Sequence, residues 1–512
     1  MAMNLQFFGH NCFIVGGDSA QVIIDPWLSE KGAFYGSWYQ WPINHFAKPL
    51  LIDKAAGRET YVYISHEHQD HFDTDTLAEL KRVCSKALIP SYYDKYLRSS
   101  LEQLGFTVTE LPDGAEFNIA PDFSIRLLIV DTGVNHDSAA LIKVGNELFI
   151  NQNDCKIFDR LHAIKEPVTY YAVQFSGATW HPVSYTYTPE EKREISRKKV
   201  ASKLVAIKNM IRHLQPKFYF PSAGPAIFPH LDAELSLGEG NIFIHQPQLD
   251  KLLKTSGTKL VYLRPGEIFE SHLNSCPIPP PTRSELVEIS KSLPSAWEAS
   301  SIPFSPLKLT KAIQLRLNQV VDLKFETCPK LILNWGHHNK IDGISIDLNA
   351  GSVLPTNQLP STDYMLVSAS QHYFALMSDP KTRWQDLYLT LRASVTRIPD
   401  MFNTFLNIFL FSDVENIRKA FQTTLCISED RIVKLDPHSG RCFEINRFCP
   451  HNGADLLDAD IDPLGNLICP RHAWKFQLNQ NGRCAETGAS IKAAEVVNTI
   501  TLCESISARL TR

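Results

Sequence analysis

The chain has 512 residues, of which 44% are hydrophobic and 21% charged, and its formal net charge is −4. Because single hydrophobic cores stop growing well below this length, two or three domains are expected. General nucleic-acid binders are usually basic overall, and a membrane helix needs roughly 18 uninterrupted apolar residues, which no run in this sequence reaches. We therefore expect no nucleic-acid partner and no membrane span.

The first residues, Met1-Ala2-Met3-Asn4-Leu5-Gln6, lack the basic stretch and long apolar run of a secretory signal. Eleven cysteines in a chain of this size, without such a signal, are better explained as reduced thiols and metal ligands than as a disulfide framework. We therefore expect a cytoplasmic protein.

Short apolar strands are expected early in the chain, and they alternate with helical stretches, as in a layered domain of helices and strands. A well-marked helix begins at Thr188-Pro189-Glu190-Glu191, where Thr188 and Glu191 form a capping box, and it should end near Gln215-Pro216. The expected strands cover residues 5–8, 12–15, 21–24 and 61–64.

The clearest boundary is the proline-rich segment 276–282, because consecutive prolines favour an extended linker. We place a first domain at 1–275, a middle α+β domain at 283–420 and a small all-β domain at 421–512. In the middle domain we expect strands at 331–334 and 364–368, then a helix in which Trp384, Leu387, Leu391 and Val395 share one face. Its role is not legible from the sequence.

Two cysteine–histidine pairs in the last domain predict a metal cluster. Cys449-Pro450-His451 and Cys469-Pro470-Arg471-His472 each offer one thiolate and one imidazole, which is the ligand set of a Rieske two-iron two-sulfur cluster. A Cys2His2 zinc site uses the same ligand types. Proline after both cysteines, the continuation Ala473-Trp474-Lys475-Phe476 and the later Gly482-Arg483-Cys484 resemble Rieske domains rather than zinc fingers.

The segment Ser65-His66-Glu67-His68-Gln69-Asp70-His71 places four potential ligands within six residues at the end of a strand. The other interpretation is a polar surface turn with solvated histidines. The spacing lets His66 and His68 face one metal while Asp70 and His71 turn toward a second, as in the metallo-β-lactamase family, which this motif resembles.

That resemblance implies an αββα sandwich and further ligands along the chain. His136 matches the third ligand of the first metal, Asp154 the carboxylate that bridges both metals, and His230 the final ligand of the second metal. His10, His45 and His181 are further pocket candidates. Imidazole and carboxylate suit zinc, iron or manganese, so the ligands alone do not name the metal.

The first domain further resembles the cytidine-monophosphate N-acetylneuraminate hydroxylase family. The matching stretches are Asp25-Pro26-Trp27-Leu28, Ile64 to His71, Asn153-Asp154-Cys155, Leu214-Gln215-Pro216-Lys217 and Arg264-Pro265-Gly266. That family joins a Rieske centre to this fold and hydroxylates an N-acyl methyl group, which implies a monooxygenase. Here the Rieske domain follows the metallo-β-lactamase domain instead of preceding it.

We therefore expect a di-iron site that receives electrons from the cluster and uses dioxygen to oxidise a small metabolite or sugar nucleotide at carbon or nitrogen. No Gly-rich nucleotide fingerprint is apparent, so an external ferredoxin, cytochrome or flavoprotein reductase must donate the electrons. Homo-oligomerisation stays open. The alternatives are a zinc hydrolase with a redox-sensing Rieske domain and a non-enzymatic electron carrier.

The helix from Pro189 to Leu214 is rich in lysine and arginine, and these side chains either form a solvated face or help to bind an anionic substrate.

Overall fold

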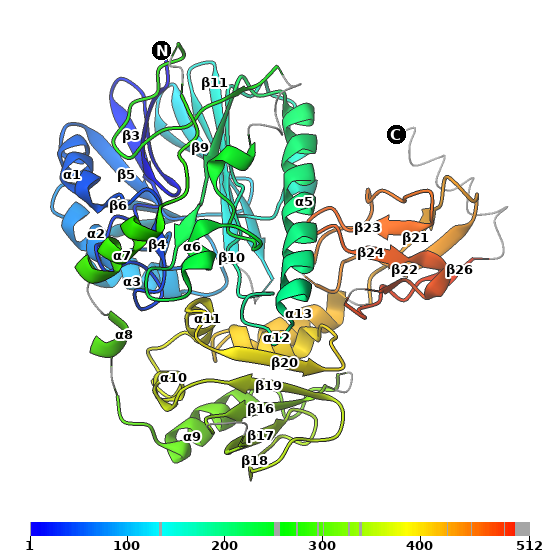
Figure 1. Ribbon diagram of the computed structural model, residues 1–512. Coiled ribbons are helices and arrows are strands. Elements are labelled where there is room, and N and C mark those ends of the chain that lie inside the picture. Colours follow the sequence, from blue (N-terminus) through cyan, green and yellow to red (C-terminus); the bar gives the residue numbers. More distant parts are fainter. Residues whose placement is uncertain are drawn as a thin grey trace.

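The computed structural model describes residues 2–132, 136–249, 257–272, 275–293, 296–300, 302–325, 328–336, 340–427, 429–451, 453–485 and 487–496. Three units follow one another along the chain (Figure 1). The N-terminal unit, blue to green, lies above a yellow-green unit, and the orange and red C-terminal unit packs at their side.

Two sheets stacked face to face form the N-terminal unit. The strands β2, β3 and β12 are buried along their whole length and form continuous apolar runs. Phe13, Phe149 and Phe220 meet between the sheets. The first sheet contains, in spatial order, β1 (Asn4–Gly9), β2 (Cys12–Gly16), β3 (Ala20–Ile24), β5 (Glu59–Tyr63), β6 (Lys86–Pro90) and β7 (Thr107–Leu111). The second contains β15 (Lys259–Leu260), β13 (Phe218–Ser222), β12 (Tyr170–Gln174), β11 (Glu147–Asn153), β10 (His136–Val144), β9 (Phe123–Asp131) and β8 (Glu116–Ala120).

Helices cover both outer faces of this pair of sheets. The first sheet packs against α1 (Lys48–Ala56), α2 (Thr74–Leu80) and α3 (Tyr96–Gln103), and the second against α4 (Phe158–Leu161) and α5 (Pro189–Leu214). The capping box of Thr188 and Glu191 is present, as the sequence predicts. The expected αββα sandwich is confirmed.

Several parallel strands end at the same edge of the sandwich. β3 pairs in parallel with β5, and β11 pairs in parallel with β12, which is in turn parallel to β13. Ligand sites in sheets of this kind lie beyond the carboxyl ends of parallel strands. The loops after β3, β5 and β11 carry Asp25, the histidine-rich motif and Asp154, so the fold gathers these residues at one edge.

Further short elements connect the units. A two-stranded ribbon joins β4 (Tyr39–Gln40) to β14 (Ala226–Ile227). The remaining elements of this region are 3-10 helices at His45–Ala47 and Gln246–Leu249, α6 (Ala233–Leu237), α7 (Arg283–Ser292) and α8 (Ala296–Ala299).

The middle unit is a five-stranded sheet with helices. Its strands, in spatial order, are β18 (Ser352–Thr356), β17 (Gly343–Asp347), β16 (Lys330–Asn334), β19 (Tyr364–Ser368) and β20 (Ser394–Ile398). One hydrophobic core joins them to α9 (Pro306–Leu317), α10 (Gln371–Met377), α11 (Trp384–Leu389), α12 (Thr404–Phe411) and α13 (Ile417–Ile427). The apolar segment around residues 402–411 thus forms a buried helix.

The helix expected through Val395 ends earlier than predicted. α11 stops at Leu389, Leu391 has a positive φ of 59°, and Val395 lies in β20, where it pairs with Val367. Pairing with a distant strand overrode the local helical period. The helix is therefore shorter than its sequence pattern indicates.

The C-terminal unit contains two three-stranded sheets. One joins β21 (Arg431–Leu435), β22 (Cys442–Asn446) and β26 (Ala494–Glu495), and the other joins β23 (Asn466–Ile468), β24 (Lys475–Gln477) and β25 (Arg483–Cys484), with a 3-10 helix at Leu478–Gln480. Within the described ranges, no helix is both long and apolar enough to cross a membrane. The three domain limits given above stay predictions.

Candidate metal centres

The loop after β5 is anchored by a buried carboxylate at the end of β3. Asp25 accepts hydrogen bonds from the backbone N–H of Ser65 at 2.7 Å and from the Ser65 hydroxyl at 2.7 Å. Its Oδ2 also lies 2.8 Å from Nδ1 of His71 and 2.8 Å from the side-chain amide of Asn11. Asp25 therefore fixes the start and the end of the histidine-rich loop, and it orients the His71 ring.

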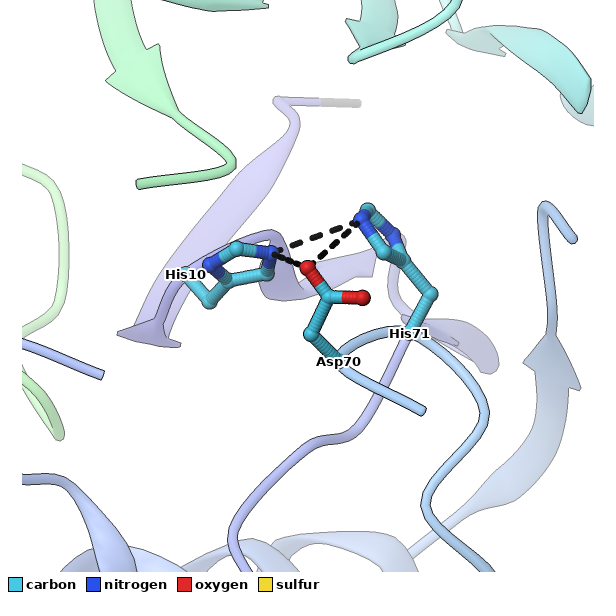
Figure 2. A group of neighbouring side chains, drawn as sticks. All are labelled: His10, Asp70 and His71. Carbon is cyan, nitrogen blue, oxygen red and sulfur yellow. Dashed lines mark hydrogen bonds and ion pairs between the residues drawn. The ribbon is translucent and has the colours of Figure 1, made fainter. Parts of the chain in front are cut away.

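His10, Asp70 and His71 point toward one another (Figure 2). Nε2 of His10 lies 3.2 Å from Oδ2 of Asp70 and 3.4 Å from Nε2 of His71, and the His71 nitrogen lies 3.8 Å from the same Asp70 oxygen. All three residues are buried. Their ligand atoms are close enough to one another to bind a single metal ion.

A second group of potential ligands contains His66, His68 and Asp154. Nε2 of His66 lies 2.9 Å from Nδ1 of His68 and 3.9 Å from Oδ1 of Asp154. The same Asp154 oxygen lies 3.4 Å from Nε2 of His71, which belongs to the first group. Asp154 is thus within reach of both groups, as a bridging carboxylate must be.

The charges at this edge fit a bound cation. Burial opposes protonation of His71, but the carboxylates of Asp154, Asp70 and Asp25 raise its pKa to about 10. Burial and the charge of His71 lower the pKa of His66 to about 3. Oδ1 of Asp154 is buried and accepts no hydrogen bond. Closely spaced imidazoles and carboxylates of this kind suit iron or zinc, so these residues could hold a dinuclear metal site.

His136 lies close to this site but faces another direction. Its Nδ1 lies 2.9 Å from Oδ1 of Asp131, and its ring contacts Tyr92. The next residue, Asp137, turns toward the ligands, with Oδ1 3.4 Å from Nδ1 of His66. Successive side chains of a strand point to opposite faces, and His136 is the first residue of β10. The structure therefore brings Asp137, and not His136, beside the His66 ring, next to its Nδ1.

His230 lies outside both groups. Its Nδ1 is 3.4 Å from the hydroxyl of Ser290 on α7, and its ring is near Tyr39. The chain after β13 forms β14, which pairs with β4 and leads His230 away from the motif loop. His10 stands in the group where His230 was expected.

Neither of the other two pocket candidates joins a group. His45 begins a 3-10 helix, and His181 contacts Tyr187. No local sequence pattern assigns a role to Asp25 or Asp137. The position of Asp25, a charged residue directly after the buried strand 21–24, could still have indicated its role. The role of Asp137 depends on the face of the strand to which its side chain points, which the sequence does not give.

The two cysteine–histidine loops of the C-terminal unit have the same backbone shape. The N–H groups of Cys449 and Cys469 donate to carbonyls five residues later, and their carbonyls accept from N–H groups four residues later. Gly453 and Ala473, which supply these donors, both have positive φ. Two matching turns thus present one pair of potential ligands each.

The four predicted cluster ligands lie together. The rings of His451 and His472 are 4.3 Å apart, and Nδ1 of each is buried with no hydrogen-bond partner. A hydrogen bond with Cys449 lowers the pKa of the Cys469 thiol, against the effect of burial. Two buried thiols beside two unpartnered imidazole nitrogens fit a Rieske cluster. Trp474 stacks on His451 with centroids 4.3 Å apart.

The second cluster loop also contacts the first domain. The guanidinium of Arg471, between Cys469 and His472, contacts the carboxylate of Asp159 at 3.2 and 3.1 Å. Asp159 lies on α4, five residues after Asp154. The first cluster loop contacts the middle unit instead, since Thr404 donates to the carbonyl of Pro450. These contacts hold the cluster ligands against the other two units.

Comparison with known proteins identifies the two outer units. The model of the β-lactamase superfamily domain matches residues 4–158, and that of the Rieske [2Fe-2S] domain matches residues 408–498. The chain joins a metallo-β-lactamase-fold domain to a Rieske domain.

Relatives in mycobacteria match nearly the whole length of this chain. A Rieske 2Fe-2S iron-sulfur protein of Mycolicibacterium smegmatis is 24% identical over 95% of this chain and 98% of its own. The cytidine monophosphate-N-acetylneuraminic acid hydroxylase of Mus musculus is 24% identical over 52% of this chain and 47% of its own length. Among solved structures, the diiron β-hydroxylase CmlA of Streptomyces venezuelae is 15% identical over 52% of this chain and 54% of its own, with a TM-score of 0.36.

The middle domain touches the metallo-β-lactamase-fold domain at the metal motif itself. Glu67 and Gln69 alternate with the ligands of the motif loop and face α11. Glu67 forms an ion pair with Arg383 at 2.8 Å, and the Gln69 amide donates to Asp386 at 2.9 Å. The alternating residues of the motif thus connect the ligand loop to the middle domain.

Proposed function

We propose that the protein is a Rieske-dependent non-haem di-iron monooxygenase acting on a small metabolite or sugar nucleotide. The single observation that carries this proposal is that both sets of candidate ligands occur in one chain, with Arg471 of the cluster loop paired to Asp159, five residues after Asp154. A hydrolytic zinc site needs no electrons, whereas reduction of dioxygen does. A one-electron carrier fixed beside a dinuclear site therefore favours redox chemistry.

The relatives support an oxidoreductase. The mouse protein of the preceding section is named as a hydroxylase, and the Rieske domain is an electron carrier. The proposed reaction consumes one dioxygen, two electrons and two protons, places one oxygen atom in the substrate and releases the other as water. When bound, the cluster would supply the electrons singly and the two irons would supply the reduction of dioxygen.

The chain's own residues prepare the ligands for this task. Because Nδ1 of His71 lies against Asp25, its Nε2 is directed toward Asp70 and Asp154. Nδ1 of His66 lies 3.0 Å from the Ser65 hydroxyl, which leaves its Nε2 toward His68 and Asp154. Asp25 and Ser65 thus fix the ring orientations and leave the inward nitrogens available to a metal. We propose His66, His68, Asp70, His71, His10 and Asp154 as the ligands of the two irons, and Cys449, His451, Cys469 and His472 as those of the cluster.

The electron donor is proposed to be a separate ferredoxin, cytochrome or flavoprotein reductase. Purified protein given NADH alone should consume no oxygen above the blank. Oxygen consumption should begin once a reductase and a ferredoxin are added. Consumption with NADH alone would contradict this part of the proposal.

The reaction is tested with isotopic oxygen. The purified protein, a ferredoxin reductase system and a fractionated metabolite extract are incubated under ¹⁶O₂ or ¹⁸O₂, and products are compared by mass spectrometry. A monooxygenase yields a product whose mass rises by about 16 in one gas and 18 in the other, only with the reductant. Product formed without reductant, with oxygen from water, would instead establish the zinc hydrolase.

A further inference from the structure

One face of α5 changes character halfway along the helix. In its C-terminal half, Ile207, Met210, Ile211 and Leu214 are buried in the core of the first domain. Continuing the same spacing of three and four residues toward the N-terminus gives Lys203, Lys199, Ser196 and Lys192. The face that packs into the domain thus continues as a row of three lysines and a buried serine.

These lysines differ from the other basic residues of the helix. Arg193 pairs with Glu190, and Arg197 and Lys198 pair with Glu194, on the exposed side. Lys192 and Lys199 instead donate to the carbonyls of Val183 and His181 at 2.7 and 3.0 Å, and Lys203 donates to the Ser176 carbonyl. The helix therefore has a solvated, paired face and a second cationic face turned toward the loop after β12.

Lys156 extends this cationic face to the metal sites. Lys156, which follows the Asp154 loop, is close enough to Lys199 and Lys203 to lower the pKa of both, after the larger effect of desolvation. In the described part of the chain, no carboxylate lies within ion-pair distance of the ammonium groups of Lys156, Lys199 and Lys203. Ammonium groups this close together repel one another. An anion bound between them would offset this repulsion.

As a group, Lys156, Lys199 and Lys203 are within electrostatic range of both centres. The charges of Lys199 and Lys156 act on His451, so both lysines are within electrostatic range of one candidate cluster ligand. Lys156 and Lys203 are likewise within electrostatic range of Asp154. Figure 1 shows α5 along the side of the first domain that faces the C-terminal domain. Lys199 is exposed, so the group can be reached from solvent.

We propose that Lys156, Lys199 and Lys203 bind a substrate group with two negative charges, either a phosphate or a dicarboxylate. This inference rests on the proposed function, because it names the class of substrate of the same site. An ammonium group has three N–H donors, and Lys199 donates one of them to a protein acceptor, the His181 carbonyl. Bound there, the anionic group would hold the rest of the substrate beside Asp154 and the ligands of the first metal.

The test is site-specific labelling of lysines in the intact, iron-containing protein without oxygen or reductant. Acetylation rates are measured by mass spectrometry at rising concentrations of inorganic phosphate or of succinate, with chloride added to match the ionic strength. Lys198 is the internal control, because it neighbours Lys199 but pairs with Glu194. We expect saturable protection of Lys199 and Lys203 by about fivefold or more, and none at Lys198. Protection by phosphate alone identifies a phosphate group, and protection by succinate alone a dicarboxylate.

Variants test whether the lysines act together. Lys203→Gln should raise the half-protecting concentration at Lys199 about tenfold, as loss of a charge-assisted hydrogen bond implies, whereas Lys203→Arg and Lys198→Gln should leave it within about twofold. Absence of saturable protection in the wild-type protein, or equal protection of Lys198 and Lys199, would overturn the proposal. The labelling requires no turnover, so its failure leaves the oxygenase proposal standing, and failure of ¹⁸O incorporation leaves the anion site standing.

Discussion

The ion pair between Arg471 and Asp159 should control electron transfer between the two centres. Its side chains are only 8% and 14% exposed, so replacing Asp159 by Asn leaves a cation in a poorly solvated contact. Removing one partner of a buried charge pair costs about 2 to 5 kcal/mol. Because separation of the domains returns Arg471 to water, we take the lower value, which reduces the ratio of docked to separated domains about 30-fold.

The assay follows oxidation of the reduced cluster by absorbance in a stopped-flow instrument after mixing with oxygen. In Asp159→Asn the rate should fall by up to about 30-fold, because electron tunnelling weakens steeply with distance. From Asp154 to Asp159 the chain can span at most about 18 Å, so the docked arrangement keeps the centres near each other. The cluster's spectrum should be unchanged, since Asp159 contributes no ligand.

Two variants control this experiment. Glu166→Gln removes an exposed ion pair with Arg126, and such pairs contribute little, so its rate should equal that of the wild type. Asp159→Asn combined with Arg471→Gln leaves no unpaired buried charge and should recover part of the rate. Hydrogen exchange at residues 469–472 should increase in the single variant. An unchanged oxidation rate together with increased exchange would refute the role given to this contact.

The remaining predictions concern the ligands. His10→Ala should lower the iron content of the first domain by about one atom per chain, whereas His230→Ala should leave it unchanged; the reverse result in elemental analysis would restore His230 as the ligand. Cys449→Ser should abolish the Rieske absorption and multiple turnover but still permit one oxidation of substrate after chemical reduction of the N-terminal irons, and Asp154→Ala should show the opposite pattern. In the metal-free protein the pKa of His71 is raised to about 10, so the ring is protonated in the folded state at pH 8. The protonated ring stabilises the folded state fully below the ordinary histidine pKa near 6.5. This stabilisation is lost as the pH rises through 10. Adding metal at pH 8 in weak buffer should therefore release about one proton per chain, and an indicator dye that records no release would contradict the pKa of His71.

Local signals predicted much of this structure. The capping box placed the start of α5 at its observed residue, because cap and helix are formed by neighbouring residues. The two cysteine–histidine segments and the motif from His66 to His71 also contain their ligands within a few residues. In each case the spacing in the sequence is nearly the spacing in space, so the sequence alone could indicate which side chains gather.

The parts that the sequence could not place depend on contacts between distant segments. His10 reaches its group through the turn between β1 and β2, and its carbonyl accepts from the N–H of Ala223 after β13. The choice between His136 and Asp137 depends on which face of β10 each residue occupies, and a shift of one residue reverses it. Val395 joined a strand because a partner strand was available. None of these outcomes leaves a trace in the local pattern.

The most direct test of the central claim, that one chain joins two iron centres for redox chemistry, is the elemental and sulfide analysis of the purified protein. A two-iron two-sulfur cluster and a di-iron site predict about four irons, two acid-labile sulfides and no stoichiometric zinc per chain. Two irons with two sulfides, accompanied by two zinc ions and by an activity that ignores reductants, would contradict the claim and establish a hydrolase.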